Sequence, residues 1–143
     1  MVNVVAKNIG VILEEPKGKC NDIKCPFHGS LTVRGRQFSG IVVSTKMRKT
    51  AVAEFERLYF LKKYERYEKR RTRLKVHNPE CINAQEGEVV QIMECRPLSK
   101  TKNFVIIKKL GMEKGFKEKM EARESGKFEK SKKEEEAKTE DGN

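Results

Sequence analysis

The chain has 143 residues and contains 32 Lys and Arg against 21 Asp and Glu, a formal net charge of +11. This length fits one domain of ordinary size with room for a tail, and the charge favours a polyanionic partner. No apolar run reaches the roughly 18 residues of a transmembrane helix, and the first residues lack the apolar core of a signal peptide. No basic amphipathic helix for membrane binding is evident. We therefore expect a cytoplasmic protein with no membrane partner.

The positive charge is unevenly distributed along the chain. Residues 1–110 carry 23 basic and 11 acidic side chains, whereas residues 111–143 carry 9 and 10. We expect an N-terminal extension over residues 1–30, a basic domain over 31–110 and a charged tail over 111–143. The tail has the composition of one marginal helix followed by disorder from about Ser125.

The first predicted element covers residues 30–44, where apolar side chains alternate and end on a β-branched run. It is either one long bent strand or a tight hairpin that turns at Gly35. Gly40, inside the apolar run, is predicted to form a β-bulge that lets the strand curve.

Four more strands are predicted further along the chain. One covers residues 51–60, a weaker strand or turn lies within 72–78, and a pair covers 87–96 and 103–110. Five short strands in about 80 residues favour an all-β fold, a small five-stranded barrel of the oligonucleotide-binding (OB) type. An SH3-like barrel is the alternative that the pattern leaves open.

The densest basic segment is "KKYERYEKRRTRLK" at residues 62–75, with eight basic and two acidic side chains. Basic groups neutralise phosphates, and interleaved tyrosines pack on sugar or base. Close arginines repel one another without an anion, which favours nucleic-acid contact over a merely solvated helical or loop face. The candidate RNA-binding residues are Lys62, Lys63, Tyr64, Arg66, Tyr67, Lys69, Arg70, Arg71, Arg73 and His77. For His77, a place in the core is an equally good interpretation.

Two further basic loops, "STKMRKT" at 44–50 and "RPLSKTK" at 96–102, connect the first strand to the second and the fourth to the fifth. In an OB-type barrel these two loops flank the binding face. Pro97 is expected to stiffen the second loop. Solubility alone is the competing explanation. The cations that these loops present as candidate RNA contacts are Lys46, Arg48, Lys49, Arg96, Lys100 and Lys102.

Three segments together closely resemble a known family: "GIVVSTKMRKTAVAEF", "YERYEKRRTRLKVHNP" and "GEVVQIMECRPLSKTKNFVII". The family is the universal small-subunit ribosomal protein number seventeen, called eleven in eukaryotes. The likeness runs from about Leu31 to Leu110. Glu88 stands where the family pattern usually has Asp, a conservative departure. The segment "CNDIKCPFHGSLTVRGRQFSG" is similar to the archaeal and eukaryotic branch.

The resemblance implies an OB-type barrel that binds small-subunit rRNA early in assembly and stays on the ribosome as a structural component. Motif by motif, it implies these RNA contacts in the two loops: Lys46, Met47, Lys49 and Thr50 in the first, and Arg96, Ser99, Lys100 and Lys102 in the second. The implied partners are small-subunit rRNA and neighbouring small-subunit ribosomal proteins, and the family has no enzymatic activity.

The cysteines Cys20, Cys25, Cys81 and Cys95 are expected to be reduced. Cys20 and Cys25 stand near His28, and a zinc site would need a fourth ligand from Cys81 or Cys95, if the fold brings one close. Cys95, in a predicted strand, reads more simply as a small buried side chain. Because the spacing is weak beside a paired C-x₂-C repeat, the sequence favours no metal and no other cofactor.

Catalytic chemistry has no support in the sequence. There is no poised acid–base pair, phosphate-cradling glycine loop or metal–carboxylate cluster, so neither an enzymatic activity nor a small-molecule substrate is predicted, and a zinc-dependent enzyme is remote. A free-standing RNA chaperone or translation factor on the same barrel is the other hypothesis. Such a protein binds single strands through exposed aromatic side chains. The predicted strands show no cluster of surface aromatics, which disfavours it.

Overall fold

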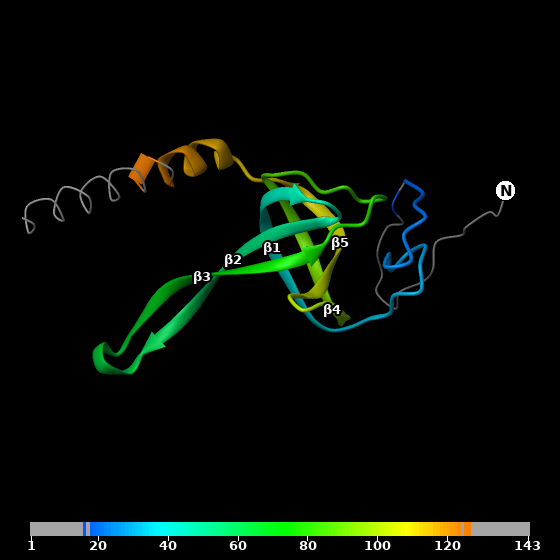
Figure 1. The fold of residues 1–143 in the computed structure, drawn as a ribbon. Helices are drawn as coiled ribbons and strands as arrows, with labels where there is room; N and C mark the ends of the chain where they lie inside the picture. Colours follow the sequence, from blue (N-terminus) through cyan, green and yellow to red (C-terminus); the bar gives the residue numbers. More distant parts are fainter. Residues whose placement is uncertain (1–15, 17, 124, 127–143) are drawn as a thin grey trace, which may run out of the picture. The chain divides into compact units, whose positions relative to one another are not determined.

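The structure is a computed structural model that describes residues 16, 18–123, 125 and 126. Its elements are strands β1 (Val33–Met47) and β2 (Thr50–Leu61), the short 3-10 helix η1 (Lys62–Tyr64), and strands β3 (Arg66–His77), β4 (Glu88–Ser99) and β5 (Lys102–Met112), as Figure 1 shows.

The five strands close into a barrel in the order β1-β2-β3-β5-β4. Strands β3 and β5 pair in parallel, and every other pairing is antiparallel. Closure satisfies the strand edges that an open sheet would expose. The prediction of an all-β, five-stranded OB-type barrel is confirmed.

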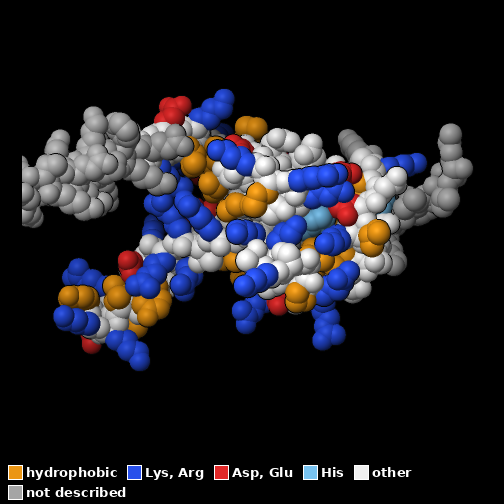
Figure 2. Space-filling view, viewed as in Figure 1, with side chains coloured by type: hydrophobic (Ala, Val, Ile, Leu, Met, Phe, Trp, Pro, Cys, Tyr) orange, Lys and Arg blue, Asp and Glu red, His pale blue; other side chains and the backbone are white. Residues whose placement is uncertain are grey.

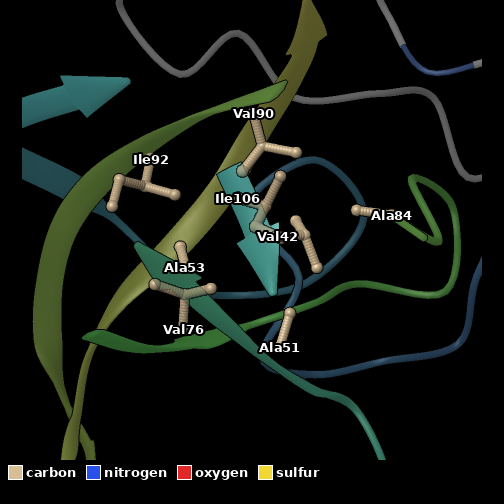
Figure 3. Close-up of a cluster of buried hydrophobic side chains, with 8 residues drawn as sticks. All are labelled: Val42, Ala51, Ala53, Val76, Ala84, Val90, Ile92 and Ile106. Carbon is tan, nitrogen blue, oxygen red and sulfur yellow. The ribbon is translucent and has the colours of Figure 1, made fainter. Parts of the chain in front are cut away.

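Small and β-branched side chains fill the barrel. Figure 3 shows them pointing toward one another from every strand, with Ala84 contributed by the connection between β3 and β4: Val42, Ala51, Ala53, Val76, Ala84, Val90, Ile92 and Ile106. The amide of Ala84 donates a hydrogen bond to Oδ1 of Asn78, and Nδ2 of Asn78 donates one to the carbonyl of Ala84, each over 3.0 Å. Asn78 therefore holds in place the segment that closes this part of the core.

Strand β1 is one long bent strand, without a hairpin at Gly35. Its register against β4 shifts between Val33 and Gln37, and Gly35 lies within this irregularity with φ +115°. Such a backbone conformation strains any residue with a Cβ. The bend thus comes from a glycine bulge.

Gly40 does not form the predicted bulge. Its pairing with β4 is regular, and the register shift against β2 falls between Val42 and Ser44. A Cβ at Gly40 would lie 2.9 Å from the backbone oxygen of Glu54 on β2. Glycine is needed here because the neighbouring backbone approaches closely.

The segment "RPLSKTK" is mostly strand. Strand β4 continues to Ser99 and β5 begins at Lys102, so the connection contains two residues. Pro97 lies in β4, where the register with β5 shifts between Glu94 and Ser99. An irregular stretch is the place where a strand tolerates proline, because no ladder hydrogen bond is lost there. The expectation that Pro97 stiffens the turn itself is therefore wrong.

Strands β2 and β3 are longer than predicted. They pair without a register shift from Thr50 opposite His77 out to Leu61 opposite Arg66. Figure 1 shows this β2–β3 hairpin projecting well beyond the barrel. The weak strand predicted within 72–78 is the barrel end of β3, and the rest of the basic segment forms the arm.

The chain divides into two compact units, Met1–Met112 and Glu113–Asn143. In the second unit residues 116–123, 125 and 126 are helical, so the predicted helix is present and extends slightly past Ser125. The remainder of the predicted disordered tail lies outside the described residues. Among the described residues, no helix is long and apolar enough to span a bilayer.

Candidate nucleic-acid interface

The β1–β2 turn and the β4–β5 turn lie side by side at one end of the barrel. The ammonium group of Lys102 donates a hydrogen bond to Oγ1 of Thr50 over 3.0 Å, joining the first residue of β5 to the first residue of β2. Oγ1 of Thr50 donates in turn to the backbone carbonyl of Arg48 at 3.1 Å. The structure thus brings the two cationic turns together, as the predicted barrel requires.

Lys102 is half-buried, unlike the solvated lysine expected in a loop. Burial lowers the pKa of its ammonium group, as does the nearby charge of Lys24. Lys100, in the turn itself, is exposed. One lysine of this turn is therefore part of the packing between strands, while the other is accessible to a ligand.

Lys49, at the tip of the first turn, adopts a left-handed conformation with φ +51°. Its ammonium group lies 2.9 Å from Oε1 of Glu80 and 3.8 Å from Oδ2 of Asp22. Asp22 belongs to the segment before β1, and Glu80 to the connection between β3 and β4. Acidic neighbours thus hold Lys49 in position and reduce the charge it presents.

His77 is buried, and its side chain is 2% exposed. Its Nε2 lies 3.0 Å from Oδ2 of Asp22. Burial lowers the pKa of the imidazole, and the attraction of Asp22 opposes that shift only in part. The structure therefore places His77 in the core, and stacking of its ring on RNA is not available in this arrangement.

Beside the first turn there is an open groove of about 460 Å³. It is lined on one side by the turn and the end of β1 and on the other by the connection between β3 and β4: Thr45, Lys46, Met47, Arg48, Lys49, Thr50, Asn78, Glu80, Asn83 and Gln85. Cations and side-chain amides in one concave surface suit phosphate and base edges together.

The β2–β3 hairpin carries like charges directly opposite one another. Arg57 pairs with Arg70 across the two strands, an arrangement that is destabilising without compensation. Both guanidinium groups lie over the ring of Tyr59, at 5.9 Å and 4.0 Å from its centroid. Cation–π attraction offsets part of the repulsion. A polyanion would offset more.

Two of the predicted RNA-binding arginines have acidic partners. Nε of Arg70 is 2.8 Å from Glu68, and Nε of Arg73 is 2.8 Å from the buried carboxylate of Glu54. Strand alternation also directs Arg70 and Arg71 to opposite faces. Repulsion among the neighbouring arginines is therefore weaker than the sequence argument assumed.

The far part of the hairpin exposes aromatic side chains. Tyr59, Phe60, Tyr64 and Tyr67 are 41%, 45%, 64% and 69% exposed, and the rings of Phe60 and Tyr67 are 5.1 Å apart. Figure 2 shows hydrophobic side chains among Lys and Arg at the end of this arm. The expectation that the strands carry no cluster of surface aromatics is wrong.

The remaining predicted RNA-binding residues separate by exposure. Two of them, Lys49 and Lys102, are half-buried, and two, Thr50 and His77, are buried. The others are exposed: Lys46, Met47, Arg48, Lys62, Lys63, Tyr64, Arg66, Tyr67, Lys69, Arg70, Arg71, Arg73, Arg96, Ser99 and Lys100. Arg57 and Tyr59 are also exposed on the hairpin but were not among the predicted RNA-binding residues. The signal in the sequence was that the predicted strand at residues 51–60 continues with an arginine and aromatic residues beyond the apolar positions of the barrel core.

Three cysteines and one histidine meet on the unit that contains the barrel. Cys20, Cys25, His28 and Cys81 place their ligand atoms within 4.8 Å of one another. Cys95 lies elsewhere, in a cluster with Leu31, Val33, Val105 and Ile107. All four cysteines are free, without disulfide bonds.

The structure defines a closed, five-stranded OB-type barrel protein with two adjoining cationic turns and a basic, aromatic arm. The family model described as Ribosomal protein S17 matches residues 40–108. The chain belongs to this ribosomal protein family, as the following archaeal relatives establish.

The relatives are small ribosomal subunit proteins uS17. That of Methanocaldococcus jannaschii is 53% identical over 108 residues, 76% of this chain and 92% of the relative. That of Methanopyrus kandleri is 54% identical over 106 residues, 74% and 90% of the two chains. That of Methanococcus vannielii is 54% identical over 102 residues, 71% of this chain and 94% of the relative.

Proposed function

We propose that the chain is a structural constituent of the small ribosomal subunit, that it binds small-subunit rRNA and that it supports subunit assembly. Its place is then the cytoplasmic ribosome, with rRNA and neighbouring ribosomal proteins as partners. The relatives carry the name of a small-subunit protein, and the family is structural rather than catalytic.

The observation that carries the RNA-binding proposal is the junction of the two cationic turns through Lys102 and Thr50, 3.0 Å apart. It places Arg48, Lys100 and the groove beside β1 on one end of the barrel. The β2–β3 hairpin adds a second, projecting contact with seven basic and three acidic side chains over residues 56–71. Together they form a two-part surface for a folded RNA, the turns for phosphates and the arm for stacking and charge.

The test compares matched pairs of lysines. Lys62→Ala with Lys69→Ala removes two exposed charges from the hairpin, and Lys114→Ala with Lys117→Ala removes two from the other unit. A filter-binding titration against small-subunit rRNA is expected to show at least a tenfold loss for the hairpin pair and little change for the control. Equal losses would mean that net charge alone, and no defined surface, drives binding.

Salt dependence gives an independent check. Each phosphate contact releases counterions, so log K is expected to fall with log salt by about 0.7 to 0.9 per contact. A surface of two turns and an arm is expected to give a slope of several contacts. A slope near zero would rule out the electrostatic account.

One observation favours a second candidate, a free-standing RNA chaperone. The exposed rings of Tyr59, Phe60, Tyr64 and Tyr67 are suited to stacking on unpaired bases. Such a protein binds transiently, whereas a subunit constituent stays bound. Retention on small ribosomal subunits after a high-salt wash supports the constituent, and complete release supports the chaperone.

A further inference from the structure

Four side chains from two distant parts of the sequence converge on one point. Cys20, Cys25 and His28 lie in the segment before β1, and Cys81 lies in the connection between β3 and β4. Sγ of Cys25 is 3.6 Å from Sγ of Cys81 and 3.7 Å from Nδ1 of His28. Sγ of Cys20 is 3.4 Å from the same Nδ1. All four ligand atoms therefore face one small volume.

These three separations, 3.4–3.7 Å, are close to the edges of a metal-centred tetrahedron, and all four ligand atoms lie within 4.8 Å of one another. With Zn–S near 2.3 Å and Zn–N near 2.0–2.1 Å, tetrahedral coordination places neighbouring ligand atoms ~3.5–3.8 Å apart. A disulfide between Cys25 and Cys81 would leave Cys20 and His28 unexplained. Simple apolar packing is seen at Cys95, which lies among aliphatic side chains. Cys20, Cys25 and Cys81 also pack with Phe27 and Ile82, but apolar packing does not explain why Nδ1 of His28 lies 3.4 and 3.7 Å from two of the sulfurs.

The backbone around the cluster is built to hold the ligands in place. The amide of Cys25 donates to the carbonyl of Asp22 and the amide of Gly29 to that of Cys25, both at 3.0 Å. The amide of His28 donates to Sγ of Cys25 at 3.5 Å, the kind of outer hydrogen bond that orients a metal-binding sulfur. A Cβ at Gly29 would overlap the carbonyl oxygen of Ile23, so this tight turn requires glycine.

The second part of the site is equally constrained. Pro26 follows Cys25, Pro79 precedes Cys81 by two residues, and both prolines are fully buried. The amide of Asn83 donates to the carbonyl of Pro79 at 2.8 Å, which closes the turn that presents Cys81. Two rigid loops thus present their ligands with little freedom to lose on binding.

We propose that Sγ of Cys20, Cys25 and Cys81 and Nδ1 of His28 bind one structural Zn²⁺ ion. Three sulfurs and one imidazole nitrogen form a soft, tetrahedral ligand set that suits zinc. A complete set of four protein ligands leaves no open position for substrate, so the ion has no catalytic role. Binding replaces the thiol protons, which leave to solvent as the three thiolates coordinate the ion.

The ion fastens the segment before β1 to the β3–β4 connection. Within that segment, Asp22 is two residues from Cys20 and reaches His77 at 3.0 Å and Lys49 at 3.8 Å. Zinc thereby holds in place the acidic residue that positions the tip of the first cationic turn. The zinc site itself does not depend on RNA binding by that turn.

The experiment measures metal in the purified full chain and in two matched cysteine variants. Elemental analysis is expected to find one zinc per wild-type chain, one in Cys95→Ser, and less than one-tenth in Cys81→Ser. Cys95 is the matched control because it is also buried but lies away from the cluster. Less than one-tenth zinc in the wild type, iron in its place, or full zinc in Cys81→Ser would overturn the proposal.

A spectroscopic titration keeps the test independent of whether Cys81→Ser folds. Wild-type chain stripped with a chelator and titrated with Co²⁺ is expected to show the visible bands of tetrahedral cobalt and thiolate-to-cobalt charge transfer, saturating at one equivalent. His28→Cys is expected to retain a tetrahedral site with a stronger charge-transfer band. Weak bands of octahedral cobalt, or no saturation, would contradict a built site.

Discussion

At the scale of single residues, packing explains why position 40 is a glycine and why His77 is buried. Gly40 lies where β1 and β2 approach so closely that a Cβ would be 2.9 Å from the oxygen of Glu54. His77 is a polar side chain inside the barrel end, with Asp22 beside it. Neither residue is explained by RNA contact.

Gly40→Ala is expected to destabilise the barrel by about 1–3 kcal/mol, because the added methyl group forces the strand backbones apart. Chemical denaturation measures this change. Gly126→Ala is the control, since open space surrounds Gly126, and its barrel transition is expected to stay unchanged. A Gly40→Ala midpoint equal to that of the wild type would show that the strands relax freely.

Stability is expected to fall as the pH is lowered below about 6.5. Burial lowers the pKa of folded His77 below the ordinary value of 6.5, so the unfolded chain takes up the proton first. The unfolded state then binds more protons, and the free energy of unfolding falls by up to about 1.4 kcal/mol per pH unit until the folded pKa is reached. The charged groups facing His77 are Asp22 and Lys102.

His77→Gln separates this effect from other acid-sensitive groups. Glutamine stays polar but does not titrate, so its unfolding curves between pH 7 and 5 are expected to shift less than those of the wild type. Loss of metal or protonation of carboxylates would affect both proteins alike. Parallel slopes would therefore show that His77 does not contribute.

At the scale of elements, two lysines close in sequence have different roles. Lys102 connects β5 to β2 through Thr50, whereas Lys100 is exposed in the turn. Lys102 is the first residue of β5 and pairs with Ser99 and Lys75, whereas Lys100 lies in the two-residue connection outside the strand pairing.

Lys102→Ala is expected to lower the free energy of unfolding by about 1 kcal/mol, since Thr50 loses a charged hydrogen-bond donor in a half-buried site. Lys100→Ala is expected to change it by less than about 0.5 kcal/mol. Both variants are expected to bind rRNA more weakly. Thermal melts beside filter binding separate the two effects, and equal melting temperatures would show that the Lys102 hydrogen bond adds nothing.

At the scale of the whole molecule, the barrel with its preceding segment and the C-terminal unit are distinct. Strand β5 ends at Met112, and the boundary between the compact units follows at once. The C-terminal unit has 9 basic and 10 acidic side chains, so it brings no excess of positive charge. The buried barrel core and the two cationic turns are built from residues of the first unit.

Removing residues 113–143 is therefore expected to leave the unfolding midpoint of the barrel and its rRNA affinity nearly unchanged. The measurements are a denaturation curve and a binding titration on the shortened chain. A loss of cooperative unfolding, or a tenfold weaker affinity, would show that the second unit supports the barrel or the interface.

The sequence alone predicted five strands and their order, but it left open a hairpin at Gly35 and an SH3-like barrel. Alternating apolar residues and β-branched runs predicted the strands, because one face of each strand must be buried. The spacing of five such segments predicted a small barrel. The positions of the cationic loops followed from that. The segment at residues 62–75 was ambiguous because its polar composition resembles a loop, while its pairing with β2 is a contact between distant residues.

Only the tertiary structure decided which side chains of one pattern serve packing and which face solvent. From the sequence, Thr50, His77 and Lys102 were candidate RNA contacts beside the exposed cations. In the structure, packing between strands leaves Lys102 half-buried and Thr50 and His77 buried. The choice between Cys81 and Cys95 beside Cys20, Cys25 and His28 was open for the same reason. Sequence spacing constrains neighbours within one loop, whereas barrel closure brings together residues that are more than fifty positions apart, such as Cys25 and Cys81.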